Sequence, residues 1–313
     1  MHTMRIPVIE AGASKDYREI PPPDILQSLD STGAVLLRGF NFDLENFEAL
    51  THIFCNDFHT VAARHAYREL QGDSYSTQVV SKNFTILSHT EGTFQPHVKR
   101  PPELCFFMCV TPPAEPGGET TLLDGIAFLD RLPAALRKRF EDTGLTYEMY
   151  WEKERWQNEF AIEDTQSMKA WLASVPGVRF TIHGDELHLF YTTKAITRSR
   201  RGDPVFATGL LAHLPRIVHP KYCDKKVYTK PSNRVYFGDG EELPDGVINE
   251  LIDIQDSLAY PHRWQAQDTL VIDNTRTLHG RTMTERDCER VLVSRFGWLK
   301  PVFAGIGGTL FIP

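Results

Sequence analysis

Cysteine is scarce in this chain of 313 residues. The five cysteines are an odd and scattered set: Cys55, Cys105, Cys109, Cys223 and Cys288. No CxxC pair occurs among them, which argues against a disulfide framework and against a thiolate metal site. Cys105 and Cys109 lie in an apolar run and are predicted to be buried core thiols. The set indicates reduced thiols and therefore a cytoplasmic protein.

The chain also lacks long hydrophobic runs and an excess of positive charge. No segment approaches the roughly 18 apolar residues that a membrane span needs, and no apolar signal core follows the N-terminal residues 1–5. The formal net charge is -7 at pH 7 and the pI is about 6.0, which argues against general nucleic-acid binding. We therefore expect neither a membrane nor a nucleic acid as a partner.

Internal repeats, low-complexity tracts and linker-like runs of Gly, Ser and Pro are likewise missing. The composition, with 41% hydrophobic and 24% charged residues, is that of an ordinary globular protein. The sequence thus predicts a single domain over residues 1–313.

Short apolar segments separated by turn residues run through the whole sequence. Strands are predicted at 34–40, 84–89, 104–110, 119–123, 145–151, 269–273 and 290–296, with a hairpin of 178–182 and 186–191. Helices are predicted at 24–30, 43–54, 165–174 and 244–256, and between 126 and 144. Many short strands with helices between them predict a mainly β fold, an antiparallel barrel or jelly roll decorated by helical insertions.

The tripeptide His89-Thr90-Glu91 lies at the end of one predicted strand. In an extended strand, residues i and i+2 point to the same face, so His89 and Glu91 offer an imidazole nitrogen and a carboxylate oxygen to one point. His279, far downstream, would complete a set of two histidines and one carboxylate. Such a set leaves half of an octahedral metal open, which suits non-haem Fe(II) oxygenases. Taken alone, both histidines could be satisfied core residues.

Four motifs in order resemble those of the TauD/TfdA-like Fe(II)/2-oxoglutarate-dependent dioxygenases. They are His89-Thr90-Glu91, then Gly117-Gly118-Glu119-Thr120, then Asp273-Asn274 leading to His279-Gly280-Arg281, and finally Arg290. The segment 34–40, ending in Arg38-Gly39-Phe40, also matches an early family element, so the resemblance covers nearly the whole chain. The carboxylate is Glu91 where taurine dioxygenase has an aspartate, and this resembles the clavaminate synthase and asparagine oxygenase branch.

The resemblance implies a double-stranded β-helix, a cupin-like jelly roll with iron inside it. His89, Glu91 and His279 match the family's iron ligands. Arg290 matches the arginine that holds the distal carboxylate of 2-oxoglutarate, and Thr120 matches the threonine that assists it. A guanidinium suits this task because it gives a carboxylate two parallel hydrogen bonds and keeps its charge. The implied cofactors are Fe(II), the co-substrate 2-oxoglutarate and O2.

Substrate-binding residues are less clearly marked. In members similar to taurine dioxygenase, a substrate-binding arginine sits four residues after the arginine that holds 2-oxoglutarate, and here that position is Ser294. Strand alternation places Ser294 on the face of Arg290 and turns Arg295 away from it. Gln78 and Arg281 are further candidates, with a structural ion pair as the alternative for Arg281.

Two basic stretches, 194–201 and 221–230, match no family motif. They are solvated loops, or they receive an acidic substrate or an acidic carrier protein. The polar segment 59–78 is either a solvated connection or a binding loop. Histidines without a matching motif are predicted to lie on the surface or in the core: His97, His183, His188, His213 and His219.

Together these observations predict an oxidoreductase that couples 2-oxoglutarate decarboxylation to oxidation of an unactivated C–H bond. Hydroxylation is the expected outcome, with desaturation, cyclisation or epoxidation as alternatives. Glu91 argues against halogenation, because family halogenases lack that ligand. The resemblance implies a small-molecule substrate, an amino acid or amino-acid-derived metabolite of secondary metabolism, free or tethered to a carrier protein. The competing hypotheses are an inactive jelly-roll binding or scaffold protein and a metal-dependent hydrolase or isomerase.

Overall fold

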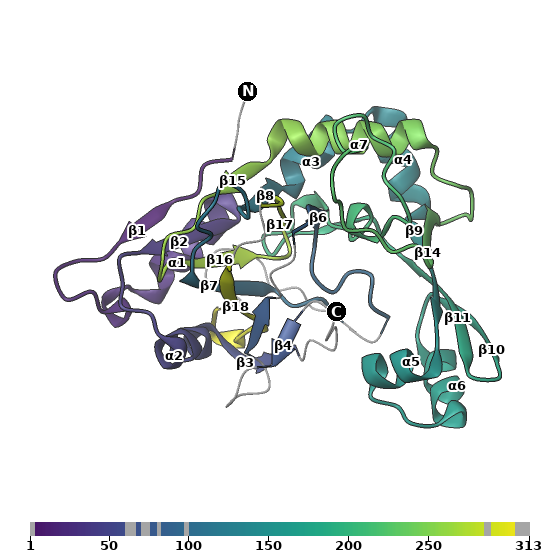
Figure 1. Cartoon of the computed structure of the whole chain (residues 1–313), viewed down its shortest axis with the longest axis horizontal. Helices are drawn as coiled ribbons and strands as arrows, with labels where there is room; N and C mark the ends of the chain where they lie inside the picture. The colour runs from purple at the N-terminus through teal and green to yellow at the C-terminus, as the bar shows by residue number, and fades with distance from the viewer. Residues whose placement is uncertain are drawn as a thin grey trace.

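A large sheet occupies the left half of the molecule as drawn in Figure 1. The computed structural model describes residues 4–59, 67–69, 76–79, 83–96, 100–284 and 289–303. The strands of the large sheet are β1 (Val8–Glu10), β2 (Ala34–Arg38), β3 (Cys55–Phe58), β4 (Tyr67–Glu69), β5 (Thr77–Val79), β7 (Leu104–Thr111), β16 (Thr269–Asp273) and β18 (Val291–Leu299). Their order is β1-β2-β16-β7-β18-β5-β4, and β3 also pairs with β18. Apart from the parallel pair β1–β2, the pairings described in this sheet are antiparallel.

A smaller antiparallel sheet faces the large one. It consists of β6 (Ile86–His89), β8 (Thr120–Asp124), β15 (Tyr260–His262) and β17 (Thr277–Arg281), in the order β15-β8-β17-β6. Apolar side chains of both sheets share one buried cluster, with Phe107 and Phe296 from the large sheet and Leu122 from the small one. Two antiparallel sheets closed around a common core form a jelly roll, so the predicted fold class is confirmed.

Strand β7 of the large sheet is apolar on both faces because each face meets a different core. In β7, Cys105 and Phe107 point into the cluster between the sheets, whereas Phe106 and Met108 belong to a second cluster. Two helices, α1 (Pro22–Thr32) and α2 (Leu44–Phe54), contribute to this second cluster. A strand buried on both sides reads as a continuous apolar run, which is why 104–110 was recognised in the sequence.

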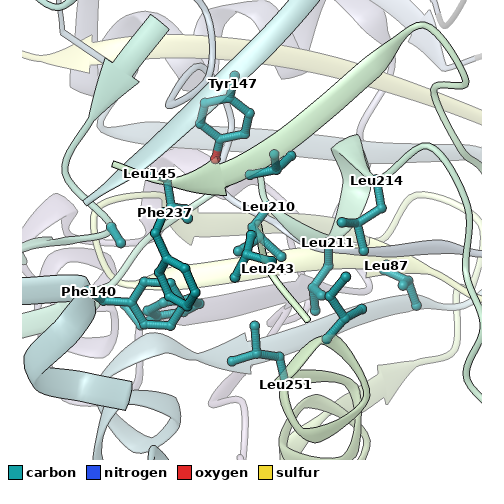
Figure 2. Close-up of a cluster of buried hydrophobic side chains, with 14 of the residues drawn as sticks. Leu87, Phe140, Leu145, Tyr147, Leu210, Leu211, Leu214, Phe237, Leu243 and Leu251 are labelled. Carbon is teal, nitrogen blue, oxygen red and sulfur yellow. The ribbon is translucent and has the colours of Figure 1, made fainter. Parts of the chain in front are cut away.

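The third and largest core cluster lies around a four-stranded sheet of order β10-β11-β9-β14 (Figure 2). Its strands are β9 (Leu145–Trp151), β10 (Val178–His183), β11 (Glu186–Thr193) and β14 (Asn233–Phe237). The helices of this part are α3 (Gly125–Arg131), α4 (Ala134–Thr143), α5 (Lys153–Phe160), α6 (Thr165–Ser174) and α7 (Asp245–Leu258). Figure 1 shows α3, α4 and α7 together near the small sheet, and α5 and α6 beside the β10–β11 hairpin. A short pair, β12 (Ile196–Arg198) and β13 (Pro204–Phe206), packs against α3. None of the described helices is both long and apolar enough to cross a membrane.

Most predicted elements are confirmed, with informative exceptions. The helix predicted at 43–54 is α2, and its N-cap Asp43 accepts a hydrogen bond from the Asn46 amide at 2.7 Å. Helix α5 was missed because its sequence is strongly polar and only Trp156 is buried. The segment 59–78 was expected to be irregular but contains β4 and β5. Most of that segment lies outside the described residues, as do His97 and Cys288. A single domain over 1–313 stays a prediction.

An ion pair fastens β2 to the turn that precedes β16. Arg38 donates two hydrogen bonds to Asp268, from Nε to Oδ1 at 2.8 Å and from Nη2 to Oδ2 at 2.6 Å. The Asp268 carboxylate is buried and also accepts from the Gln265 amide at 2.9 Å. Burial alone would raise the pKa of Asp268, but the bonds from Arg38 and its other partners leave that pKa below the ordinary value.

Replacing Asp268 by Asn should lower the free energy of unfolding at pH 7 by about 2 to 3 kcal/mol, because breaking a buried ion pair strands one charge. Arg38 keeps some contact with solvent, its side chain being 24% exposed, so the loss is smaller than for a fully buried pair. Because the pKa of Asp268 is lower in the folded than in the unfolded protein, its carboxylate stabilises the fold above about pH 4. The difference in the free energy of unfolding between the unmodified protein and Asp268→Asn should therefore become smaller at lower pH. Urea unfolding measures both effects. Asp142→Asn, in an exposed pair with Lys138, is the control, and an equal loss there would contradict the assignment.

Candidate metal centre and cavity

Two histidines lie directly opposite each other in the small sheet. His89 is the last residue of β6, His279 is the middle residue of β17, and the antiparallel register pairs the two. Their ring centroids are 4.6 Å apart. Phe107 of the large sheet contacts the His279 ring at 5.4 Å between centroids. Main-chain pairing therefore brings together two imidazoles from distant parts of the sequence.

Glu91 reaches the same point by a route that the sequence argument did not foresee. We expected His89 and Glu91 on one extended strand, but β6 ends at His89 and Glu91 lies in the following turn. The side chain of Asn274 holds this turn: its Oδ1 accepts from the Glu91 amide at 3.0 Å, and its Nδ2 donates to the Glu91 carbonyl at 3.1 Å. Asp273 closes the neighbouring turn by accepting from the Thr275 amide at 2.9 Å. Asp273 and Asn274 thus hold two neighbouring turns, one before His279 and one at Glu91.

The ligand atoms of His89, Glu91 and His279 all lie within 4.8 Å of one another. His89 Nδ1 is 3.2 Å from the Leu87 carbonyl, so it carries the proton and donates to that oxygen. Nε2 then keeps its lone pair, and it lies 3.8 Å from Glu91 Oε2. Two neutral imidazoles and one carboxylate on one side of a point suit an Fe(II) ion with open positions. The donor set therefore fits the metal that the sequence implies.

Burial makes this cluster receptive to a cation. It lowers the pKa of His89 to about 4 and holds that of His279 well below its ordinary value, with a further contribution from His89. Both rings are therefore neutral near pH 7, the form in which imidazole binds metals. Burial also raises the pKa of Glu91 to about 7, because an isolated carboxylate is costly away from water. A bound cation would offset that cost.

Arg290 and Thr120 lie on the same cavity wall as the three ligands. Arg290 Nη1 donates to the Gly118 carbonyl at 2.6 Å. Gly117 and Gly118 both have positive φ, 97° and 72°, and a side chain at Gly117 would collide with the Met283 carbonyl. The Gly-Gly pair thus allows the chain to pass close to Met283 and Thr284, with the Gly118 carbonyl facing Arg290. Thr120 Oγ1 accepts a hydrogen bond from Trp264 Nε1 at 3.1 Å.

A cavity of about 180 Å3 opens in front of these groups. Besides the residues above, its polar walls contain Gln95, Arg155, Glu159, His213, Lys230, Asn233 and Arg281. Its apolar and aromatic walls include Phe84, Ile86, Phe94, Phe107, Met149, Trp151, Tyr228 and Leu292. An apolar pocket with a few convergent polar groups is the usual form of a small-molecule site.

Of the predicted substrate-binding residues, the structure places one at the cavity and one away from it. Arg281 lines the cavity, with its guanidinium 4.7 Å over the Phe84 ring. Ser294 is fully buried and is not among the residues that line the cavity. Arg295 points to the opposite face, as expected, with Nη1 3.0 Å from Ser76 Oγ. The side chain of Gln78 lies outside the described residues. Substrate contacts of Ser294 and Gln78 stay predictions.

Sequence reasoning missed several residues of the cavity wall. Arg155 and Glu159 come from α5, which was not predicted. His213 was assigned to the surface or core, and it is buried in the wall. Lys230 ends the basic stretch 221–230, so its charge was noted but its position was not. Lys225 and Lys226 of that stretch are exposed, and no residue of the other stretch, 194–201, is among the lining residues.

Comparison with known proteins agrees with this geometry. The chain matches the family described as "Taurine catabolism dioxygenase TauD, TfdA family" over residues 12–295. It is 25% identical over 285 residues to the dapdiamide synthesis protein DdaC of Enterobacter agglomerans, covering 81% of this chain and 79% of DdaC. A clavaminate synthase-like protein of Arabidopsis thaliana is 25% identical over 277 residues, covering 81% of this chain and 78% of the relative.

Solved structures show the same fold at low sequence identity. PvcB of Pseudomonas aeruginosa superposes with a TM-score of 0.55 at 18% identity, covering 94% of this chain and 89% of PvcB. PvcB is described as an Fe, alpha-ketoglutarate dependent oxygenase from an isonitrile synthetic pathway. AAD-2, solved with Mn(II) and N-oxalylglycine, gives a TM-score of 0.52 at 14% identity and covers 96% of each chain.

Replacing Asn274 by Ala should weaken metal binding by about 10- to 100-fold, the usual effect of removing a group that orients a ligand. The physical reason is that the turn carrying Glu91 loses both of its side-chain hydrogen bonds. Anaerobic titration with Fe(II), or with Mn(II) followed by electron paramagnetic resonance, measures the dissociation constant. Asn158→Ala, at an exposed position of α5, should bind metal as the unmodified protein does. Equal affinity of both variants would show that Glu91 does not depend on Asn274.

Proposed function

The chain belongs to the TauD/TfdA family of Fe(II)- and 2-oxoglutarate-dependent dioxygenases, and from this premise we propose that it hydroxylates an unactivated C–H bond of a small molecule. The observation that carries the proposal is the convergence of His89, Glu91 and His279 within 4.8 Å at a cavity that also contains Arg290. When bound, Fe(II) supplies the redox chemistry that turns 2-oxoglutarate, O2 and a C–H bond into succinate, CO2 and an alcohol. The protein supplies the positions of these reactants.

Three protein ligands leave three positions of an octahedral ion for the two oxygens of a 2-oxoacid and for O2. In the described part of the chain, His89, Glu91 and His279 form one group of potential ligands with no fourth His, Cys, Asp or Glu. Glu91 also favours hydroxylation over halogenation, because a carboxylate occupies the position that a halide would need. Desaturation, cyclisation and epoxidation use the same ligand set and are alternative outcomes.

Arg290 is proposed to bind the distal carboxylate of 2-oxoglutarate. Its bond to the Gly118 carbonyl orients the guanidinium at the cavity wall, and a planar guanidinium pairs with a carboxylate through two parallel hydrogen bonds. Thr120 supports this assignment: because its oxygen already accepts from Trp264, its own hydroxyl proton is available to an anion.

For the substrate we propose an amino acid or an amino-acid-derived metabolite of secondary metabolism, free or tethered to a carrier protein. The similarity to a dapdiamide synthesis protein and to a clavaminate synthase-like protein supports this class. The walls of Phe94, Trp151 and Tyr228 suit an apolar body, and the charged groups beside them suit polar ends. We also propose a reducing, cytoplasmic compartment, in which Cys55, Cys105 and Cys109 remain buried free thiols.

Anaerobic addition of Fe(II) and 2-oxoglutarate should produce a visible charge-transfer band, because the 2-oxoacid chelates the metal. His89→Ala should abolish the band and the formation of succinate, since it removes one of the three metal ligands. His183→Ala, at an exposed position, should retain both. A protein without any band, behaving like its His89→Ala variant, would instead be the inactive jelly-roll binding protein considered above.

Arg290→Lys should weaken 2-oxoglutarate binding by about 10- to 100-fold, because it loses a charge-assisted hydrogen bond of about 1.5–3 kcal/mol. Titration of the charge-transfer band with 2-oxoglutarate measures the dissociation constant, while the affinity for Fe(II) alone should stay unchanged. Arg263→Lys is the control, because the Arg263 side chain is 90% exposed. An unchanged dissociation constant in Arg290→Lys would remove Arg290 from the co-substrate site.

A further inference from the structure

Three charged residues of the cavity wall, Arg155, Glu159 and Lys230, are together called its outer wall, and two of them are cations that the reaction with 2-oxoglutarate does not use. Arg155 comes from α5 and Lys230 from the segment before β14, and both line the cavity with the metal ligands. Glu159, four residues after Arg155, lies on the same face of the helix. In the part of the chain that the structure describes, neither cation has a carboxylate within 4.0 Å. Glu159 stabilises both charges from a greater distance, and Glu91 contributes to stabilising that of Lys230. Among the described residues, however, neither cation has an anion in direct contact.

Lys230 is held at the cavity by a neutral partner. Its Nζ lies 2.6 Å from His213 Nε2, and His213 Nδ1 lies 2.8 Å from the Gly209 carbonyl. Nδ1 therefore carries the imidazole proton, and Nε2 accepts from the ammonium. One of three ammonium protons is used in this bond, and the ammonium also lies 5.0 Å from the centre of the Phe94 ring. Burial lowers the pKa of Lys230 to about 8, which leaves it mainly cationic at pH 7.

Arg155 is held by its helix and by an aromatic face. Trp156 is fully buried and donates from Nε1 to the Asp185 carbonyl at 3.1 Å, which fixes the rotation of α5. The Arg155 guanidinium lies 5.2 Å from the centre of the Trp151 ring, which contributes a cation–π contact. The guanidinium makes no hydrogen bond to another described residue. Its donors are therefore free for a ligand.

We propose that Arg155 and Lys230 together bind a free carboxylate of the substrate, so that the enzyme acts on a carboxylic acid whose reacting carbon lies toward His89 and His279. Two cations at the wall of a largely apolar cavity favour an anion, because neither has a carboxylate of the described residues in direct contact and both keep hydrogen-bond donors for one. This inference rests on the proposed function. It also assigns the anion site to residues other than Ser294, where relatives of taurine dioxygenase place an arginine.

The walls between the two ends of the cavity set the shape of this acid. Phe94, Trp151 and Met149 contribute apolar surface beside the cations, which suits an aliphatic or aromatic body. Glu159 is the one carboxylate in the outer wall, and Gln95 Nε2 donates to its Oε1 at 3.4 Å. The Glu159 carboxylate can pair with an ammonium group of the substrate. Amino acids and acids without an amine are therefore both used as probes.

The test measures binding without turnover. Protein loaded with Mn(II) and N-oxalylglycine is titrated by calorimetry with the protein amino acids, 3-phenylpropanoate and 4-methylpentanoate, each beside its primary amide. At least one acid should bind, and its amide should bind about tenfold more weakly or not at all, because it lacks the charge. Arg155→Met and Lys230→Met should each weaken that acid by about tenfold or more while leaving the weak binding of the amide unchanged.

Two kinds of control separate an anion site from general damage. Arg131→Met and Lys225→Met remove exposed cations and should bind the acid like the unmodified protein. Lys230→Arg keeps the charge and should restore most of the affinity that Lys230→Met loses. A variant that weakens acid and amide equally has lost structure and not charge recognition, and that result would count against the proposal.

Besides that result, three outcomes overturn the inference: equal affinity for acid and amide, unchanged affinity in both Met variants, or no binding by any acid of the set. A substrate tethered through its carboxylate would behave like the amide and give the first of these. The charge-transfer band with Fe(II) and 2-oxoglutarate is recorded on the same preparations. If the band is present but no acid binds, the proposed anion site is wrong and the proposed dioxygenase function is unaffected. If the band is absent, the proposed function itself is wrong.

Discussion

The register between β6 and β17 is the constraint on which the rest of the site depends. Residues directly opposite in an antiparallel pair lie close together, and a slip by one residue turns every side chain to the other face. His89 and His279 are such a pair, so backbone hydrogen bonds determine the spacing of their rings. Strand β6 is the edge strand of the small sheet, and a helix holds it from the other side. The side-chain oxygen of Gln255 in α7 accepts a hydrogen bond from the Ser88 backbone amide at 2.7 Å. The sheet and the helix packed on it thus fix the positions of the two histidine side chains through backbone contacts.

Charge differs between two groups of cavity residues, the metal ligands, which we call the inner end, and Arg155, Glu159 and Lys230, which we call the outer end. At the inner end, neutral histidines and a costly carboxylate favour a cation. At the outer end, Arg155 and Lys230 favour an anion, with Glu159 and Glu91 as opposing charges. Arg290 lines the same cavity, and its hydrogen bond to the Gly118 carbonyl restricts the orientation of its guanidinium.

Sequence reasoning located the inner end of the cavity well and the outer end poorly, and the difference has a physical cause. His89, Glu91, Thr120 and Arg290 occur in short local motifs whose order is preserved along the chain, so the pattern identifies them without coordinates. The fold class followed from the same motifs and from apolar runs such as β7. Even there, the sequence placed Glu91 on a strand, because nothing local shows that Asn274 holds it in a turn.

The outer end is built from residues with no local signal. Helix α5 buries only Trp156, so no apolar stripe reveals it, and Arg155 then looks like any surface arginine. Lys230 belongs to a basic stretch whose neighbours Lys225 and Lys226 are exposed. Only the folded chain shows that one lysine of this stretch reaches the cavity.

The position of β7 has a consequence for how the protein is made. Its two neighbours in the large sheet, β16 and β18, both lie near the other end of the chain. During synthesis on the ribosome, β7 is therefore made long before the two strands with which it pairs. Pairings between such distant segments form slowly and leave aggregation-prone surface exposed. The central pairings of the large sheet thus depend on segments that are far apart in the sequence.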